Sequence, residues 1–143
     1  MTRILDEPMF TAGPRSVFRQ LLFYWVPVLL YVSVIFYVSS LSNPPAPLHF
    51  KFADKLYHLG EYGVLGLLLG RAIRRSASPY SMLAAAVMTV SLVMLIGAAD
   101  EYYQSFVPGR DSSPYDWATD SAAAALSQLV LARFMRPRRK AAR

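Results

Sequence analysis

Cysteine is absent from the 143-residue chain, so the sequence excludes disulfide bonds, thiolate metal sites and cysteine nucleophiles. Charged residues are also scarce, at 17% of the chain, whereas about 25% is usual for a soluble protein. Hydrophobic residues reach 55%, which is above the usual roughly 45–50%. The length suits one domain, and the composition favours a membrane protein.

Four hydrophobic segments predict an all-α fold, a polytopic four-transmembrane-helix bundle. They are residues 21–41, 52–72, 82–99 and 117–134, each close to the about 20 residues that cross a bilayer as a helix. Pro27 lies near the start of the first segment, where a helix tolerates proline best. The alternative for this segment is a secretory signal peptide with Arg15 and Arg19 as its basic flank. The predicted organisation is an N-terminal segment (1–20), a membrane domain (21–134) and a basic tail (135–143).

The distribution of charge predicts the orientation in the membrane. With four spans and the N-terminus inside, twelve of the fifteen basic residues are cytoplasmic and seven of the nine acidic residues are outside. Short cytoplasmic loops are enriched in Lys and Arg, so both termini are expected on the cytoplasmic side of the membrane. The basic tail, RFMRPRRKAAR, is expected to contact anionic lipid headgroups rather than nucleic acid.

Three of the predicted helices carry polar residues on one face near their outer ends. These residues are Asp54, His58 and Glu61 on the second helix, Asp100 and Gln104 on the third, and Asp116 and Asp120 on the fourth. Spacings of four and seven residues place side chains on the same helix face. Ionisable residues within spans usually face the bundle interior and mark functional sites. The sequence therefore predicts one shared polar site at the outer leaflet.

Several of these residues also have simpler interpretations. Asp54, Lys55 and Asp111 lie near the ends of spans, where charged side chains reach water without any further role. His58 alone would more often be an interfacial histidine. Asp116 could serve mainly as the N-cap of the fourth helix and as a partner of its dipole.

Three motifs resemble those of the VanZ-like family, small bacterial membrane proteins named after a component linked to teicoplanin resistance. They are DKLYHLGEYGVLG (54–66), DEYYQSFVPGR (100–110) and DWATD (116–120), and the resemblance covers residues 21–133. It marks Asp54, Lys55, His58, Glu61, Tyr62, Asp100, Glu101, Gln104, Pro108, Gly109, Arg110 and Asp116. In the last helix the family usually shows an asparagine and a glycine-containing motif, where this chain has Asp120 and SAAAAL. The resemblance implies a multi-pass protein of the bacterial inner membrane that acts in the cell envelope.

Three hypotheses for function stay open at this point. The first is an enzyme acting on an envelope lipid or cell-wall precursor, with His58, Glu61 and Asp100 as catalytic groups. The second is a scaffold that binds a lipid headgroup, a glycopeptide or a partner, in which Arg110 pairs internally with one of the acids. The third is an ion-coupled transporter, which four short spans would support only as a homo-oligomer.

The remaining candidate site residues are assigned to binding. They are Asp54, Lys55, Tyr62, Glu101, Gln104, Arg110, Asp116 and Asp120. Arg110 offers a planar fork suited to phosphate or carboxylate. Several carboxylates with one imidazole would also suit a divalent cation such as Mg²⁺, Ca²⁺ or Mn²⁺.

Overall fold

The computed structural model describes residues 14–44, 52–76 and 81–135, and these residues are helical or connect helices, with no strand among them. The elements are α1 (Pro14–Gln20), a π-helical turn η1 (Leu21–Trp25), α2 (Val26–Ser39), α3 (Ala53–Ser76), α4 (Met82–Gln104) and α5 (Pro114–Phe134). The all-α prediction is confirmed. Residues 1–13 and 136–143, which include most of the predicted N-terminal segment and basic tail, lie outside the described residues.

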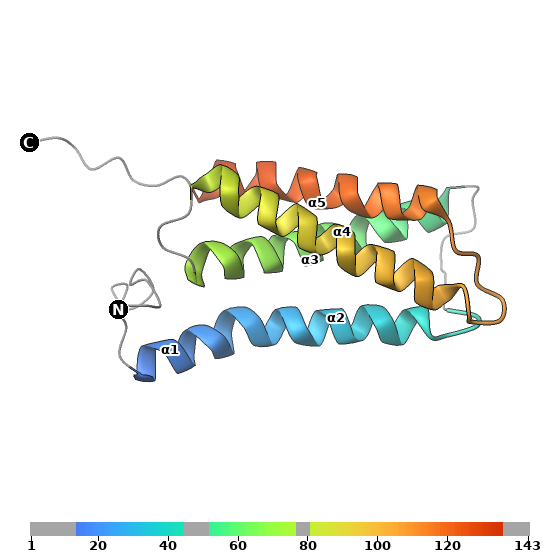
Figure 1. Cartoon of the computed structure of the whole chain (residues 1–143), viewed down its shortest axis with the longest axis horizontal. Helices are drawn as coiled ribbons and strands as arrows, with labels where there is room; N and C mark the ends of the chain where they lie inside the picture. Colours follow the sequence, from blue (N-terminus) through green and yellow to red (C-terminus); the bar gives the residue numbers. More distant parts are fainter. Residues whose placement is uncertain (1–13, 45–51, 77–80, 136–143) are drawn as a thin grey trace, which may run out of the picture.

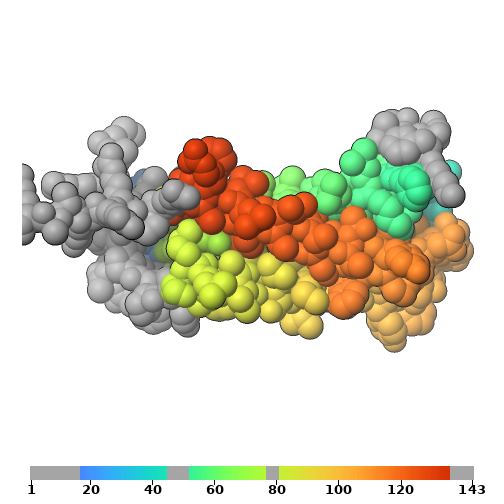
Figure 2. All heavy atoms as spheres, turned by 90° about the horizontal axis from the view of Figure 1, so that it is seen from above, coloured from blue at the N-terminus to red at the C-terminus, as the bar shows by residue number. Residues whose placement is uncertain are grey.

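Successive long helices run antiparallel in one bundle (Figure 1). Helix α3 packs most extensively against α5, which also packs along α4, and α2 makes a smaller contact with α3 and α4. Figure 2 shows α4 and α5 side by side along their length. We call the end where α2 and α4 finish and α3 and α5 begin the site end, and the opposite end the far end.

Helix boundaries follow from capping residues. The Ser81 hydroxyl accepts a hydrogen bond from the Ala84 N–H (3.1 Å) and caps α4. Ser113 caps α5 in the same way through the Tyr115 N–H (3.2 Å), and Pro114 follows at the first helical position. Serine at the N-cap and proline directly after it favour a helix start. The alternative that Asp116 caps α5 is therefore wrong, since Asp116 lies within the first turn.

Pro27 lies inside a helical run rather than at the start of one. The run begins at Pro14 and continues to Ser39, and the π-helical turn Leu21–Trp25 precedes the proline. Proline has no N–H and its ring crowds the carbonyl four residues earlier, so a wider turn before it relieves both problems. Pro27 thus lies near the start of α2, as expected, but the helical run as a whole begins earlier than expected, at Pro14.

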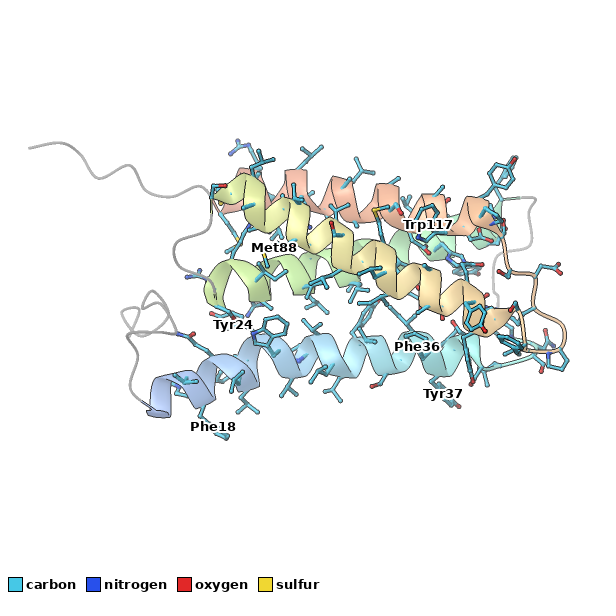
Figure 3. All side chains as sticks on the ribbon, in the orientation of Figure 1. Phe18, Tyr24, Phe36, Tyr37, Met88 and Trp117 are labelled. Atoms are coloured by element: carbon cyan, nitrogen blue, oxygen red, sulfur yellow. The ribbon has the colours of Figure 1, made fainter. Side chains whose placement is uncertain are left out.

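Two helical stretches, Val17–Ser39 and Met82–Gln104, are long and apolar enough to cross a membrane. Only 17% and 22% of their most apolar windows are buried inside the protein, unlike the core helix of a soluble protein. Figure 3 illustrates this on α2, where Phe36 faces α4 and Tyr37 points away from the bundle. Phe36 contacts Tyr103 edge to face, with 6.1 Å between ring centroids.

Glycines let α3 approach α5 closely in the middle of the bundle. A Cβ at Gly66 would clash with the Ser127 hydroxyl and lie 3.2 Å from Ala124 Cα, and a Cβ at Gly70 would lie 2.7 Å from the Gln128 side-chain oxygen. The Gln128 amide donates to the Gly66 carbonyl (3.1 Å) across this contact. Small residues permit such close helix packing in lipid.

Candidate functional site

The site end brings together the polar residues of three helices. Helices α3 and α5 begin there with acids in their first turns, Asp54 and Asp116, which interact favourably with the helix dipoles. Helix α4 ends there with three buried polar residues, Asp100, Glu101 and Gln104. In the structure, the polar residues of these three helices lie together at one end of the bundle, as the sequence predicted.

His58 of α3 pairs with Asp120 of α5. The distance from His58 Nδ1 to Asp120 Oδ1 is 2.9 Å, and the His58 ring stacks parallel to that of Tyr62. The other Asp120 oxygen, Oδ2, is buried and has no hydrogen-bond partner among the described residues. A carboxylate on one ring nitrogen fixes the orientation and tautomer of an imidazole and leaves the other nitrogen for a ligand or proton.

Asp100 connects three helices at the base of the site. Its Oδ2 accepts hydrogen bonds from the Tyr62 hydroxyl of α3 (3.1 Å) and the Gln104 amide of α4 (2.8 Å). The Gln104 amide also donates to the Ser39 hydroxyl of α2 (3.2 Å). These contacts give Asp100, Tyr62 and Gln104 a role in holding the helices together, and the predicted catalytic role of Asp100 stays a prediction.

Glu101 lies on a different face of α4 from Asp100 and has a different partner. Its Oε2 accepts a hydrogen bond from the backbone N–H of Ser113 (2.7 Å), the residue that caps α5. Its Oε1 is buried without a partner among the described residues. Glu101 therefore fixes the loop to the start of α5 and keeps one oxygen available.

Lys55 bridges α3 and α5 at the rim. Its ammonium pairs with Asp54 (2.9 Å) and with Asp116. The Asp54 carboxylate is mostly exposed, which agrees with the simpler interpretation of a charge near water, whereas Asp116 is buried. The pair of Lys55 and Asp116 adds a connection between the helices rather than a reactive group.

Arg110 stands on a tight turn over the mouth of the bundle. Its N–H donates to the Val107 carbonyl (3.1 Å), and Gly109 has φ 82°, a conformation that favours glycine. A Cβ at Gly109 would lie 2.9 Å from the Ser42 carbonyl oxygen, so the turn also packs closely against the end of α2. Arg110 forms no ion pair with an acid among the described residues, and its buried Nε has no partner there. The hypothesis that Arg110 pairs internally with Asp100, Glu101 or Asp116 is wrong for these residues.

Two cavities open next to these residues. The larger, about 560 Å³, lies between α2 and α3 and has both apolar and ionisable walls. It is lined by Tyr31, Val38, Pro44, Ala53, Asp54, Leu56, Tyr57, His58, Gly60, Glu61 and Arg110. The second, about 440 Å³, lies over Lys55, Gln104 and Asp116, and it shares His58 and Arg110 with the first. Glu61 thus faces the larger cavity, which it shares with His58 and Arg110.

One group of side chains has the composition of a metal site. His58, Glu101 and Asp120 each offer one ligand atom, and these atoms all lie within 4.8 Å of one another. Imidazole nitrogen and carboxylate oxygen are common ligands of divalent ions.

Three contributors were not predicted from the sequence. Tyr31 and Ser39 lie in the uniformly apolar first segment, where neither stands out. Ser113 could have been found, because a serine directly before a proline at a helix start is an N-cap signal.

Comparison with protein-family models, with curated proteins and with solved structures found no match. The resemblance to the VanZ-like family therefore depends on the three motifs alone and stays a prediction.

Proposed function

We propose that this chain is a four-span protein of a bacterial inner membrane that binds an amphipathic cell-envelope ligand with an anionic headgroup at its outer face. Its side chains support the membrane location, because many large apolar side chains are exposed along the long helices while several polar and charged side chains are buried. Buried positions include Asp100, Asp120 and Gln128, while Leu83, Leu129 and other large apolar side chains are exposed on all the long helices. In lipid, such an arrangement places apolar groups against hydrocarbon and polar groups inside.

Charge supports the orientation. Among the described basic residues, Arg71, Arg74, Arg75 and Arg133 lie toward the far end of α3 and α5, and Lys55 and Arg110 lie at the site end. The acids of these helices lie at or near the site end. With basic residues on the cytoplasmic side, the site end faces outward.

The absence of cysteine makes this orientation simple to test. A single cysteine in place of Ser112, which is exposed in the site-end loop, should react with a membrane-impermeant maleimide in intact bacterial cells. A cysteine in place of Arg133, exposed at the far end of α5, should react only after the cells are permeabilised. The opposite result would reverse the orientation and place the site in the cytoplasm.

The observation that carries the ligand proposal is the unpaired Arg110 beside a cavity of mixed polarity. Tyr31, Val38 and Leu56 give that cavity apolar walls, and Arg110 supplies a partly buried guanidinium with a free donor. A guanidinium recognises phosphate or carboxylate through parallel hydrogen bonds. A lipid with an acyl or prenyl chain and a phosphate headgroup would place its chain against the apolar walls and its phosphate on Arg110. The motif resemblance adds a cell-wall precursor or a glycopeptide to the same class of ligand.

An Arg110→Gln variant should therefore lose a copurifying lipid. Hydrogen bonds to charged groups contribute about 1.5–3 kcal/mol, so affinity should fall by at least tenfold. Native mass spectrometry of the protein released from detergent measures the lipid-bound fraction. The matched control is Arg133→Gln, which removes the same charge from an exposed position at the far end. Equal lipid retention in Arg110→Gln and wild type, or equal loss in the control, would contradict the proposal.

Catalysis on the same ligand is the second candidate, and the pair of His58 and Asp120 favours it. A histidine oriented by a carboxylate is a common general base, and His58 lines the same cavity as Glu61 and Arg110. The mass of the lipid recovered from the wild-type protein distinguishes the two functions. An intact lipid indicates binding alone, and a hydrolysed lipid indicates an enzyme.

A further inference from the structure

Three buried carboxylates at the site end each have an oxygen without a partner. Asp100, Glu101 and Asp120 are 2%, 7% and 0% exposed. Oδ1 of Asp100, Oε1 of Glu101 and Oδ2 of Asp120 form no hydrogen bond with any described residue. Such atoms are uncommon in folded proteins, and each of them needs a physical explanation.

The nearby cations do not balance these acids. Lys55 is engaged with Asp54 and Asp116 at the rim. Arg110 lines the two cavities and pairs with none of the described acids. The His58 ring is hydrogen-bonded to Asp120 and to no other acid among the described residues. A buried carboxylate without a counter-charge is costly in free energy, so a cation or a proton is required.

The geometry favours a metal ion at one point of this cluster. The ligand atoms of His58, Glu101 and Asp120 lie within 4.8 Å of one another and come from α3, α4 and α5. With bonds of about 2.1 Å, two ligands of one ion are at most about 4.2 Å apart, so small side-chain rotations would close the site. Gly97 leaves room for the Asp120 carboxylate, because a Cβ there would lie 3.1 Å from Asp120 Oδ2.

We propose that His58, Glu101 and Asp120 bind one divalent metal ion, and among Mg²⁺, Ca²⁺ and Mn²⁺ this ligand set matches Mn²⁺ best. Two carboxylates suit Mg²⁺, Ca²⁺ and Mn²⁺, and the imidazole nitrogen favours the first-row ion among these. Asp100, with its own unpartnered oxygen nearby on α4, adds negative charge to the site. The ion would join the three helices that pack together and would lie beside the cavity that His58 lines.

This inference rests on the buried acids and stands apart from the lipid proposal. The test is a titration of the full-length protein in detergent, stripped with a chelator, with Mn²⁺ alone. Electron paramagnetic resonance measures the free ion, and the expected result is one bound Mn²⁺ per chain. Glu101→Gln and Asp120→Asn should each weaken binding by at least tenfold, because each removes one charged ligand. The echo-detected spectrum of bound Mn²⁺ should show coupling to an imidazole nitrogen, and His58→Ala should abolish that coupling.

Two controls separate this site from general effects. Asp111→Asn removes an exposed carboxylate of the same loop and should leave Mn²⁺ affinity within about twofold of wild type. Arg110→Gln should lose lipid while it still binds Mn²⁺, so failure of one proposal does not imply failure of the other. Circular dichroism shows whether each variant folds. If Asp120→Asn does not fold, Glu101→Gln is the deciding variant. Wild-type protein that binds no Mn²⁺, or binding that Glu101→Gln leaves unchanged, would overturn the proposal and assign protons to the buried acids.

Discussion

A Gly66→Leu variant is expected to lose about 3 kcal/mol of the free energy of unfolding, or to fail to assemble the bundle. A Cβ at Gly66 would lie 3.2 Å from Ala124 Cα, which is backbone of α5 and cannot rotate away. It would also displace Ser127, and the longer side chain would separate Gln128 from the Gly66 carbonyl that it contacts. Added volume in a packed core costs about 1–3 kcal/mol, and the lost hydrogen bond adds to this. Unfolding in mixed micelles, followed by circular dichroism, measures the loss.

Gly63→Leu is the matched control on the same helix. A Cβ at Gly63 would have no neighbour within 4 Å, so the new side chain meets open space. Leucine has a better helix propensity than glycine, and this variant should be unchanged or more stable by about 0.5–1 kcal/mol. An equal loss in both variants would show that the close contact between α3 and α5 does not determine stability.

The positions of the long helices could be predicted because each hydrophobic segment is about as long as a helix that could cross a bilayer. The segments 82–99 and 117–134 fall within α4 and α5, and the segment 52–72 begins one residue before α3. The first helical run differs most: it begins at Pro14, before the predicted start, and passes through Pro27 with a π-helical turn. Local propensity marks proline as a poor interior residue, and only the surrounding helix shows how the backbone accommodates it.

The sequence predicted where the candidate site lies, but not which of its side chains contact one another. The spacing of Asp54, His58 and Glu61 places them near one face of α3. In the structure all three line the larger cavity, but their hydrogen-bond partners differ, since Asp54 pairs with Lys55 and His58 with Asp120. The rotation of each helix relative to its neighbours decides such contacts, and this rotation depends on packing between distant segments.

Helix α2 contributes to the candidate site, although its sequence did not indicate this. Its segment contains no charge, so nothing in it marked a site. Yet Tyr31 and Val38 form a wall of the larger cavity, and Ser39 accepts a hydrogen bond from Gln104. An apolar wall is what a lipid-binding cavity needs, and apolar residues in a span carry no sequence signal for it.

The second large loss of stability is expected on substitution of Asp100. The sequence predicted a catalytic role for this residue, whereas its contacts in the structure hold α2, α3 and α4 together. Asp100→Ala removes the acceptor shared by the Tyr62 hydroxyl and the Gln104 amide, both buried. Each unsatisfied buried group costs about 1–3 kcal/mol, so a loss of about 3 kcal/mol is expected in the same unfolding measurement. The contacts among α2, α3 and α4 at the site end should weaken together.

Asp100→Asn separates the two roles of this residue. The asparagine oxygen can still accept both hydrogen bonds, so stability should stay within about 1 kcal/mol of wild type. If Asp100 only holds the helices, Asp100→Asn also keeps its bound lipid and leaves the chemical state of that lipid unchanged. If Asp100 acts on the ligand, the stable variant instead retains a lipid that the wild-type protein hydrolyses. A loss of stability as large as that of Asp100→Ala would contradict the acceptor argument, because it would show that the charge and not the hydrogen bonds stabilises this end of the bundle.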